Sequence, residues 1–151
     1  MKRLALSLTT LLFTLAIFAQ QNLVGYKFIE NKGQWENQIR YRADLGAGHL
    51  YVENDGLLFG LYDQKEFSKY IKGHYQKDMQ HKLDILNCHA YKVKFVGMNE
   101  GAFFSTELRT PEYYNYYQGR DRSKWASKAY GYHRVRYEEV YDNIDFQLYS
   151  K

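Results

Sequence analysis

The chain has 151 residues, of which 45% are hydrophobic and 18% aromatic, and a formal net charge of +4 at pH 7. A chain of this length and composition can bury a core as one domain. The weakly basic balance identifies no partner by itself. The single cysteine, Cys88, excludes an intrachain disulfide, so we expect a domain held by packing, with Cys88 as a small buried apolar residue. A disulfide between two chains is the alternative.

The first residues have the three-part layout of a secretory signal peptide. Met1-Lys2-Arg3 is cationic, Leu4 to Phe18 is an uncharged apolar run, and Ala19 is a small residue before a polar segment. The apolar run is shorter than the roughly 20 residues that a membrane-spanning helix needs. We therefore predict a cleaved signal peptide over residues 1–19, a β domain over residues 20–151, a secreted or cell-surface location and no membrane span.

Segments of alternating apolar and polar residues follow the leader, as half-buried strands require. The clearest runs from Ile39 to Leu45, with charged residues on its other face. Asn54-Asp55-Gly56 predicts a tight hairpin, because glycine tolerates the positive φ of such a turn. Thr110-Pro111 should end a strand, and alternate rings of the YYNYY run from Tyr113 should point into the core. Further strands are expected at residues 24–28, 50–52, 57–61, 89–95, 103–109, 113–118, 132–137 and 144–149.

The segment from Asp63 to Asn87 lacks this alternation and is predicted to be an exposed connection. Phe67, Tyr70 and Ile71 have i, i+3, i+4 spacing, which predicts one short helix there. The pattern as a whole indicates an all-β fold. We expect an antiparallel β-sandwich or barrel-like domain with about eight strands and at most one short helix.

Histidines and acidic residues do not combine into a metal-binding pattern. His74, His81 and His89 lack the partner ligands that a zinc site requires, so we interpret them as solvated histidines. The oxygen atoms around Asp55 are too few for calcium, which takes six or more. We therefore expect no metal and no cofactor.

Three segments together resemble a known family. They are Phe28 to Trp35 (FIENKGQW), His89 to Phe95 (HAYKVKF), and Asn115 to Asp145 with its Asn-Tyr-Tyr, Lys-Trp-Ala-Ser and Ile-Asp motifs. In this order they are similar to the N-terminal domain of unknown function of large exported proteins of Bacteroidota. Those proteins often continue into propeller-type repeats or PKD modules and end in a gliding-motility-type sorting domain for type IX secretion. The resemblance implies a secreted or surface protein acting in adhesion, with downstream domains of the same protein as partners.

The chain departs from that family's pattern in three places. Arg120-Asp121 stands where members usually carry Asn-Asp, and Asp142-Asn143 where they often carry Pro-Gly, so we expect these turns to differ. The family's pattern also continues past Ile144-Asp145, whereas this chain stops at Lys151. We therefore expect a domain that is truncated at its C-terminal end. The family supplies no catalytic residue to carry over.

Three functions are compatible with these patterns. The favoured one is a non-catalytic structural or interaction module. The second is carbohydrate binding, because sugar rings stack on aromatic faces. Its candidate residues are Trp35, Tyr114, Tyr116 and Trp125, with Tyr113 and Tyr117 beside them. The third is a hydrolase that uses two facing carboxylates, for which the candidates are Glu30, Asp44, Glu53 and Asp145. No Gly-x-Ser-x-Gly motif is present, and we do not expect an enzyme.

A local excess of positive charge predicts an anionic partner or internal pairing with nearby carboxylates. The residues concerned are Arg120, Arg122, Lys124, Arg134 and Arg136. Because the chain is expected to be exported, a polysaccharide or another surface protein is favoured over nucleic acid as the partner.

Overall fold

The computed structural model describes residues 25–75 and 86–150, which form one antiparallel sheet of eight strands. Across the sheet the order is β5-β4-β3-β2-β1-β7-β6, and β8 also pairs with β7. The signal peptide expected over residues 1–19 lies outside the described residues. The strands are β1 (Phe28–Glu30), β2 (Ile39–Asp44), β3 (Gly48–Glu53), β4 (Gly56–Tyr62), β5 (Cys88–Lys94), β6 (Phe103–Tyr116), β7 (Ala126–Tyr141) and β8 (Ile144–Tyr149).

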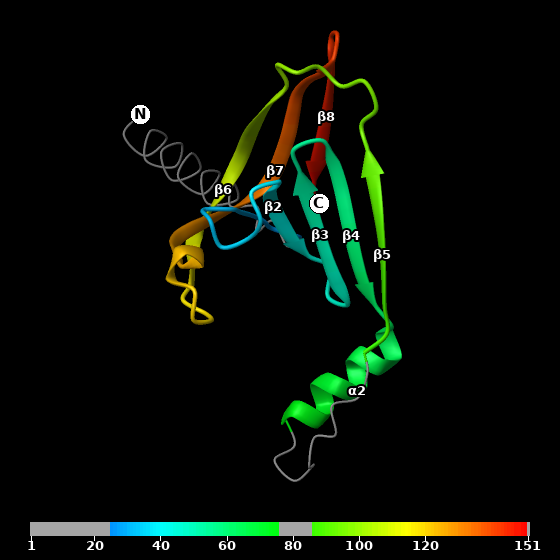
Figure 1. Ribbon diagram of the computed structural model, residues 1–151, viewed down its shortest axis with the longest axis vertical. Coiled ribbons are helices and arrows are strands. Elements are labelled where there is room, and N and C mark those ends of the chain that lie inside the picture. Colours follow the sequence, from blue (N-terminus) through cyan, green and yellow to red (C-terminus); the bar gives the residue numbers. More distant parts are fainter. Residues whose placement is uncertain (1–24, 76–85, 151) are drawn as a thin grey trace, which may run out of the picture.

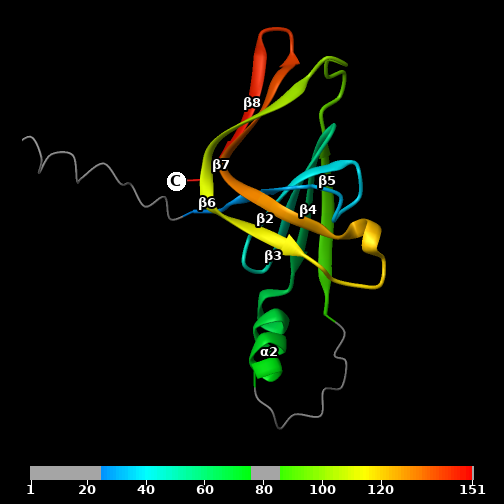
Figure 2. The same cartoon turned by 90° about the vertical axis from the view of Figure 1, so that its left-hand side faces the viewer.

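The sheet curls into a half-barrel instead of dividing into two layers (Figure 1). The predicted all-β antiparallel class is confirmed, and the barrel-like architecture is the nearer of the two that were expected. Figure 2 shows β6 and β7 bending together, and this bend produces most of the curl. Leu108 on β6, and Lys128 and Glu139 on β7, take positive φ, and the pairing register of both strands shifts near them. Such bulges add a residue to one strand and bend it.

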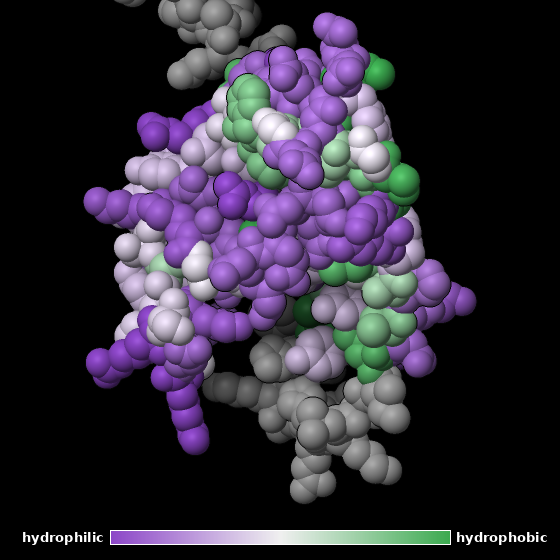
Figure 3. All heavy atoms as spheres, turned by 45° about the horizontal axis from the view of Figure 1, so that its top comes forward, coloured by the Kyte–Doolittle hydropathy of each residue, from purple (hydrophilic) through white to green (hydrophobic). Residues whose placement is uncertain are grey.

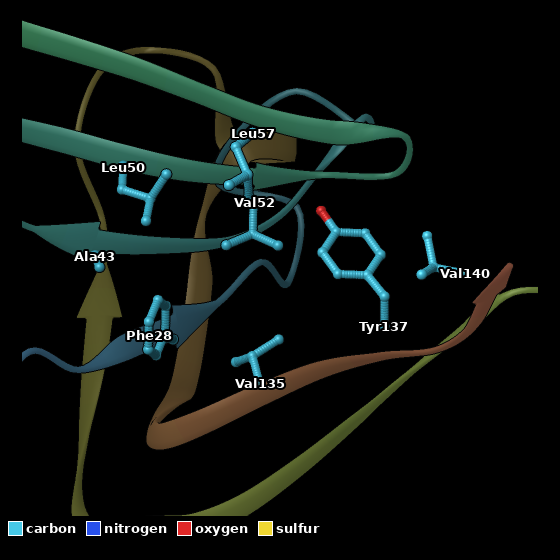
Figure 4. Packing of buried hydrophobic residues seen from close by; sticks show 8 residues of the cluster. All are labelled: Phe28, Ala43, Leu50, Val52, Leu57, Val135, Tyr137 and Val140. Atoms are coloured by element: carbon cyan, nitrogen blue, oxygen red, sulfur yellow. The ribbon is translucent and has the colours of Figure 1, made fainter. Parts of the chain in front are cut away.

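The core lies inside the curl, between β2, β3 and β4 on one side and β1 and β7 on the other (Figure 4). Val52 and Val135 are completely buried there, and Tyr137 is 1% exposed. Phe95, Phe104 and Phe146 close around the Tyr137 ring, with centroids 4.4 to 6.0 Å away. The cluster comprises Phe28, Ala43, Leu50, Val52, Leu57, Val135, Tyr137 and Val140.

The predicted hairpin around Asn54-Asp55-Gly56 is confirmed as the turn between β3 and β4. Gly56, however, begins β4 opposite Glu53 instead of standing inside the turn. Glycine is needed here because of close approach: a Cβ at this position would lie 2.0 Å from the carbonyl oxygen of Val93. The residue therefore allows β5 to lie tightly against β4.

The predicted helix is present as α2 (Gln64–Tyr75), which projects from one end of the sheet between β4 and β5 (Figure 1). Asp63 caps its first turn, since its Oδ1 accepts hydrogen bonds from the backbone N–H groups of Lys65 and Glu66 at 3.0 and 2.9 Å. Phe67 stacks on Tyr62 with ring centroids 5.3 Å apart. Of the three histidines, His89 is exposed on β5, and His81 lies outside the described residues.

Three local predictions are wrong, each for a reason that lies in the sheet order. Cys88 is exposed, because β5 is an edge strand and all seven of its residues are exposed. Tyr113, Tyr114 and Tyr117 are exposed as well, since the end of β6 lies at the opposite edge. Pro111 does not end a strand but lies within β6, where an edge strand tolerates a residue without an N–H donor.

The ends of the described domain meet on one edge of β7. The backbone N–H of Ser150, just after β8, donates a hydrogen bond to the carbonyl oxygen of His133 at 3.2 Å. The Ser150 hydroxyl donates to the carbonyl oxygen of Tyr26, just before β1, at 2.8 Å. Because β6 occupies the other edge, β8 and β1 follow one another along the same side of β7.

The face seen in Figure 3 is mainly hydrophilic, with hydrophobic residues in small separate groups. The exposed hydrophobic side chains of the domain include Val96, Phe103 and Ile144. No helix in the described part of the chain has the length and apolar character needed to cross a membrane.

Candidate functional site

A pocket of about 490 Å³ opens on the outer side of the sheet, between the β1–β2 pair and the end of β6. Ligand sites usually have this size and combine aromatic rings with a few polar groups. We call it the outer pocket. Its lining residues are Gly25, Tyr26, Lys27, Ile29, Arg42, Asp44, Tyr114, Asn115 and Tyr116.

The glycine in the middle of β7 explains why side chains of β1 and β6 come together over that strand. Gly131 pairs with Ile29 of β1. A Cβ on Gly131 would lie 3.1 Å from both the Ile29 side chain and the Thr110 hydroxyl of β6. The missing side chain therefore leaves a shallow space over β7, which side chains from both neighbouring strands fill.

Trp35 does not itself line the outer pocket but packs against two residues that do. Its ring contacts Tyr116 edge-to-face with centroids 5.4 Å apart, and the Arg42 guanidinium lies 4.6 Å from the Trp35 ring centroid. Asn31 fixes the loop that carries Trp35. Its Nδ2 donates to the carbonyl oxygens of Trp35, Glu36 and Ile39, and its Oδ1 accepts from the N–H groups of Gly33 and Trp35.

Of the four rings predicted as an aromatic platform, Trp125 alone neither lines the outer pocket nor forms a ring contact with the other three among the described residues. Tyr114 and Tyr116 line the pocket, and Trp35 supports Tyr116. Trp125 instead contacts Tyr117, with centroids 5.8 Å apart. The four residues therefore do not make one continuous surface.

The cluster around Trp125 is held by a short 3-10 turn, Arg122–Lys124. Asp121 caps this turn through its Oδ1, which accepts from the N–H and the hydroxyl of Ser123. The Arg122 guanidinium lies 5.4 Å from the Trp125 ring centroid. Lys124 pairs with Glu36 at 3.0 Å and so ties this turn to the Trp35 loop.

The predicted basic patch is largely neutralised by neighbouring carboxylates. Arg134 and Arg136 both pair with Glu107, and Arg136 also pairs with Glu138. Together with the Lys124–Glu36 pair, this leaves Arg120 and Arg122 as the members without an ion pair among the described residues. Ion pairs within the domain therefore occupy Lys124, Arg134 and Arg136.

Arg42 and Arg109 were missed by sequence reasoning. Each lies over an aromatic ring, Arg42 over Trp35 and Arg109 over Tyr130 at 4.5 Å, and neither has an ion pair among the described residues. Arginine alternating with apolar residues along Ile39 to Leu45 did indicate an outward face. Nothing local to that strand could show which aromatic rings would meet it.

The other charged groups of the outer pocket already have partners. Lys27 forms an ion pair with Glu112. The hydrogen bond between them raises the pKa of Lys27 and lowers that of Glu112. Asp44 accepts a hydrogen bond from the N–H of Gly46 at 2.8 Å. Arg42 is thus the cation of the pocket that is available to a ligand.

A second pocket of about 480 Å³ lies near β6 and contains none of the predicted site residues. One side is lined by Met98, Asn99, Glu100 and Ala102, and the rest by Arg40, Asn54, Phe103 and Phe104. The Arg40 guanidinium lies 5.7 Å from the Phe104 ring centroid, so its charge is directed to a ring that itself packs into the core.

The carboxylates considered for hydrolysis have separate structural contacts. Glu30 accepts from the N–H of Tyr130 at 2.9 Å, and Asp145 accepts from the N–H of Glu139 at 2.8 Å. Glu53 is buried and pairs with Lys92. Among the described residues, no three His, Cys, Asp or Glu side chains are grouped closely enough to hold a metal ion.

One curled antiparallel sheet with an aromatic pocket on its outer side defines a small all-β domain. The chain belongs to the family of the domain of unknown function DUF7948, whose model matches residues 28–151. The expectation of a domain of unknown function is confirmed at this level. No curated protein and no solved structure matches the chain.

Proposed function

We propose that this domain is a non-catalytic binding module of an exported protein, secreted or held at the cell surface, where it serves attachment. One observation carries the proposal: on one surface of the sheet the outer pocket gathers tyrosine rings and an arginine that has no ion pair among the described residues. Exposed rings grouped with a few polar atoms are typical of binding surfaces.

Export is supported by the leader over residues 1–19 and by the resemblance to large exported proteins of Bacteroidota. That resemblance also supports adhesion, type IX secretion and downstream domains as partners. The test is expression in a Bacteroidota host, followed by mass spectrometry of the N-terminus in each cell fraction. We expect a surface or secreted protein that starts near Gln20. A cytoplasmic protein that retains Met1 would contradict export.

A second candidate function, carbohydrate binding, is favoured by the composition of the outer pocket. Tyr114 and Tyr116 can stack against sugar rings, while Asp44 and Asn115 offer acceptor and donor atoms for hydroxyl groups. Retention on insoluble polysaccharides tests this. We expect Tyr114→Ala to reduce retention and Trp125→Ala, which is outside the pocket, to leave it unchanged. If Trp125→Ala reduces retention and Tyr114→Ala leaves it unchanged, the binding site lies at the Trp125 cluster instead.

The remaining hypothesis is a hydrolase. The proposed module binds polysaccharide without cleaving it, so retained material should release no new reducing ends. Release of reducing ends by the purified chain, abolished by Glu30→Gln or Asp44→Asn, would replace the binding proposal with an enzymatic one.

A further inference from the structure

We propose that the outer pocket binds a sugar that carries a carboxylate, such as a uronic acid unit of an anionic polysaccharide, and that Arg42 binds this carboxylate. The inference rests on the proposed binding function and specifies its ligand class. Tyr114 and Tyr116 contact the sugar ring, and Asn115 contacts a hydroxyl group.

The position of Arg42 suits recognition of a planar anion. Its guanidinium lies over the Trp35 ring at 4.6 Å and has no ion pair among the described residues. A guanidinium that stacks on a ring through its flat face still directs its N–H groups outward in its own plane. Those donors match the two oxygen atoms of a carboxylate in a bidentate pair. The Trp35 ring therefore supports the arginine without using its hydrogen-bond donors.

No carboxylate forms an ion pair with Arg42 among the described residues. Lys27 is held by Glu112, and Asp44, the carboxylate that lines the same pocket, is oriented by a hydrogen bond from the N–H of Gly46 in the β2–β3 turn. A neutral ligand would leave the charge of Arg42 without a counterpart, whereas a carboxylate would supply one. The free ion-pairing capacity of Arg42 therefore favours an acidic sugar over a neutral one.

Other residues that line the pocket suit the apolar face and the hydroxyl groups of a sugar ring. Tyr114 is 37% exposed and Tyr116 is half-buried, so both present ring surface to the pocket. The Asn115 Oδ1 already accepts a hydrogen bond from the N–H of Lys128 at 3.0 Å, which orients its Nδ2 donor. Aromatic rings for the apolar face, an amide donor for hydroxyls and an arginine for the carboxylate together define one ligand class.

The experiment is isothermal titration calorimetry of the whole chain with three acidic oligosaccharides: trigalacturonate, trimannuronate and a hyaluronan tetrasaccharide. We expect at least one to bind, and its methyl ester, which lacks the charge, to bind about tenfold more weakly or less. Arg42→Gln should cause a similar loss. Arg42→Lys should recover part of the affinity, because a lysine keeps the charge but loses the bidentate geometry.

Arg122→Gln is the matched control, since Arg122 also lies over a tryptophan but is outside the outer pocket. It should leave the affinity unchanged. Near-ultraviolet circular dichroism of each variant verifies that the aromatic packing is intact. Tyr114→Ala, which removes ring contact while keeping Arg42, should weaken the acid and its ester in equal proportion.

Three results would overturn the inference. If the methyl esters bind as tightly as the acids, the pocket binds sugars irrespective of their charge. The carbohydrate proposal would then stand, but without a preference for acidic sugars. If none of the three acids binds, the ligand class is wrong, while retention on polysaccharides still tests the proposed function separately. If an oligothymidylate binds more tightly than every acidic sugar, with the same dependence on Arg42, the site recognises nucleic acid instead.

Discussion

The hydroxyl oxygen of Tyr137 lies 2.7 Å from the carbonyl oxygen of Gly56, across the inside of the curled sheet (Figure 4). The same hydroxyl lies 2.7 Å from the carbonyl oxygen of Glu53, so its single proton is shared between both ends of the β3–β4 turn. Strand β7 is thereby bound to a turn that is more than 80 residues away in the chain. The contact joins the two sides of the half-barrel at its centre.

We expect Tyr137→Phe to lower the free energy of unfolding by about 1–3 kcal/mol, because two buried carbonyl groups lose their shared donor. Chemical unfolding followed by near-ultraviolet circular dichroism measures this difference. Tyr117→Phe is the control, since the Tyr117 side chain is 58% exposed. Equal stability of both variants would show that the hydroxyl of Tyr137 contributes nothing to the fold.

The buried tyrosines make the fold sensitive to alkali. Burial raises the pKa of Tyr137 well above its ordinary range, and it also raises the pKa of Tyr41, Tyr116 and Tyr132. In the unfolded chain these phenols ionise at about pH 10. The folded state then holds protons that the unfolded state has lost, so stability is complete below about pH 10 and decreases as the pH rises further.

Titration of tyrosinate absorbance checks this expectation. In the folded chain, part of the absorbance change should be delayed and coincide with unfolding, whereas in concentrated guanidinium all tyrosines should titrate together. A single step near the ordinary tyrosine pKa, without loss of structure, would contradict it.

Gly56 and Gly60 provide a matched pair on one strand. We expect Gly56→Ala to destabilise the domain by about 1–3 kcal/mol or more, because its Cβ would meet the Val93 carbonyl oxygen at 2.0 Å and force β5 away from β4. Gly60→Ala should be nearly neutral, since a Cβ there has no neighbour within 4 Å. Thermal unfolding of both variants is the measurement, and comparable losses at the two positions would refute the close-approach argument.

His49 makes the domain less stable in mild acid. Burial, and secondly the charge of Arg42, lower the pKa of His49. The unfolded chain takes up a proton as the pH falls below about 6.5, and the folded chain does so only at lower pH. Stability is therefore complete above about pH 6.5 and is lost as the pH falls through the lowered pKa.

Replacing His49 by glutamine should flatten this part of the stability profile. His89→Gln, at an exposed position on β5, should leave the profile as it is. Chemical unfolding between neutral and mildly acidic pH gives both curves, and identical slopes for the wild type and His49→Gln would exclude His49 as the cause.

The predictions that hold are among those that depended on neighbouring residues. Strand β2, the hairpin at Asn54-Asp55-Gly56 and helix α2 follow from alternation, turn residues and spacing over a few positions. The curl and the strand order depend on pairing between distant segments, such as β1 with β7, which no local pattern encodes. The prediction that Cys88 is buried was wrong for the same reason. Its exposure follows from the position of β5 at the edge of the sheet.

In the candidate site, too, some features could be expected from the local sequence and others depend on the fold. Aromatic residues of a binding surface, such as Tyr114 and Tyr116, could be expected from the richness of that segment in rings. The meeting of Trp35 with Arg42 depends on the loop that Asn31 organises. The pairing of Arg134 and Arg136 with Glu107 needs the register of β6 against β7. Charge in the sequence therefore indicated a cationic surface, but the fold decides which cations are neutralised.

The junction between Ser150 and Tyr26 decides how the domain would respond to mechanical load. Tension applied between these two residues acts at adjacent points, so it separates the end of β8 from the start of β1 instead of stretching the half-barrel from end to end. The hydrogen bonds to β7 would then open one after another from this junction, and the Tyr137 core would yield last. A domain pulled in this way gives up length gradually at low force.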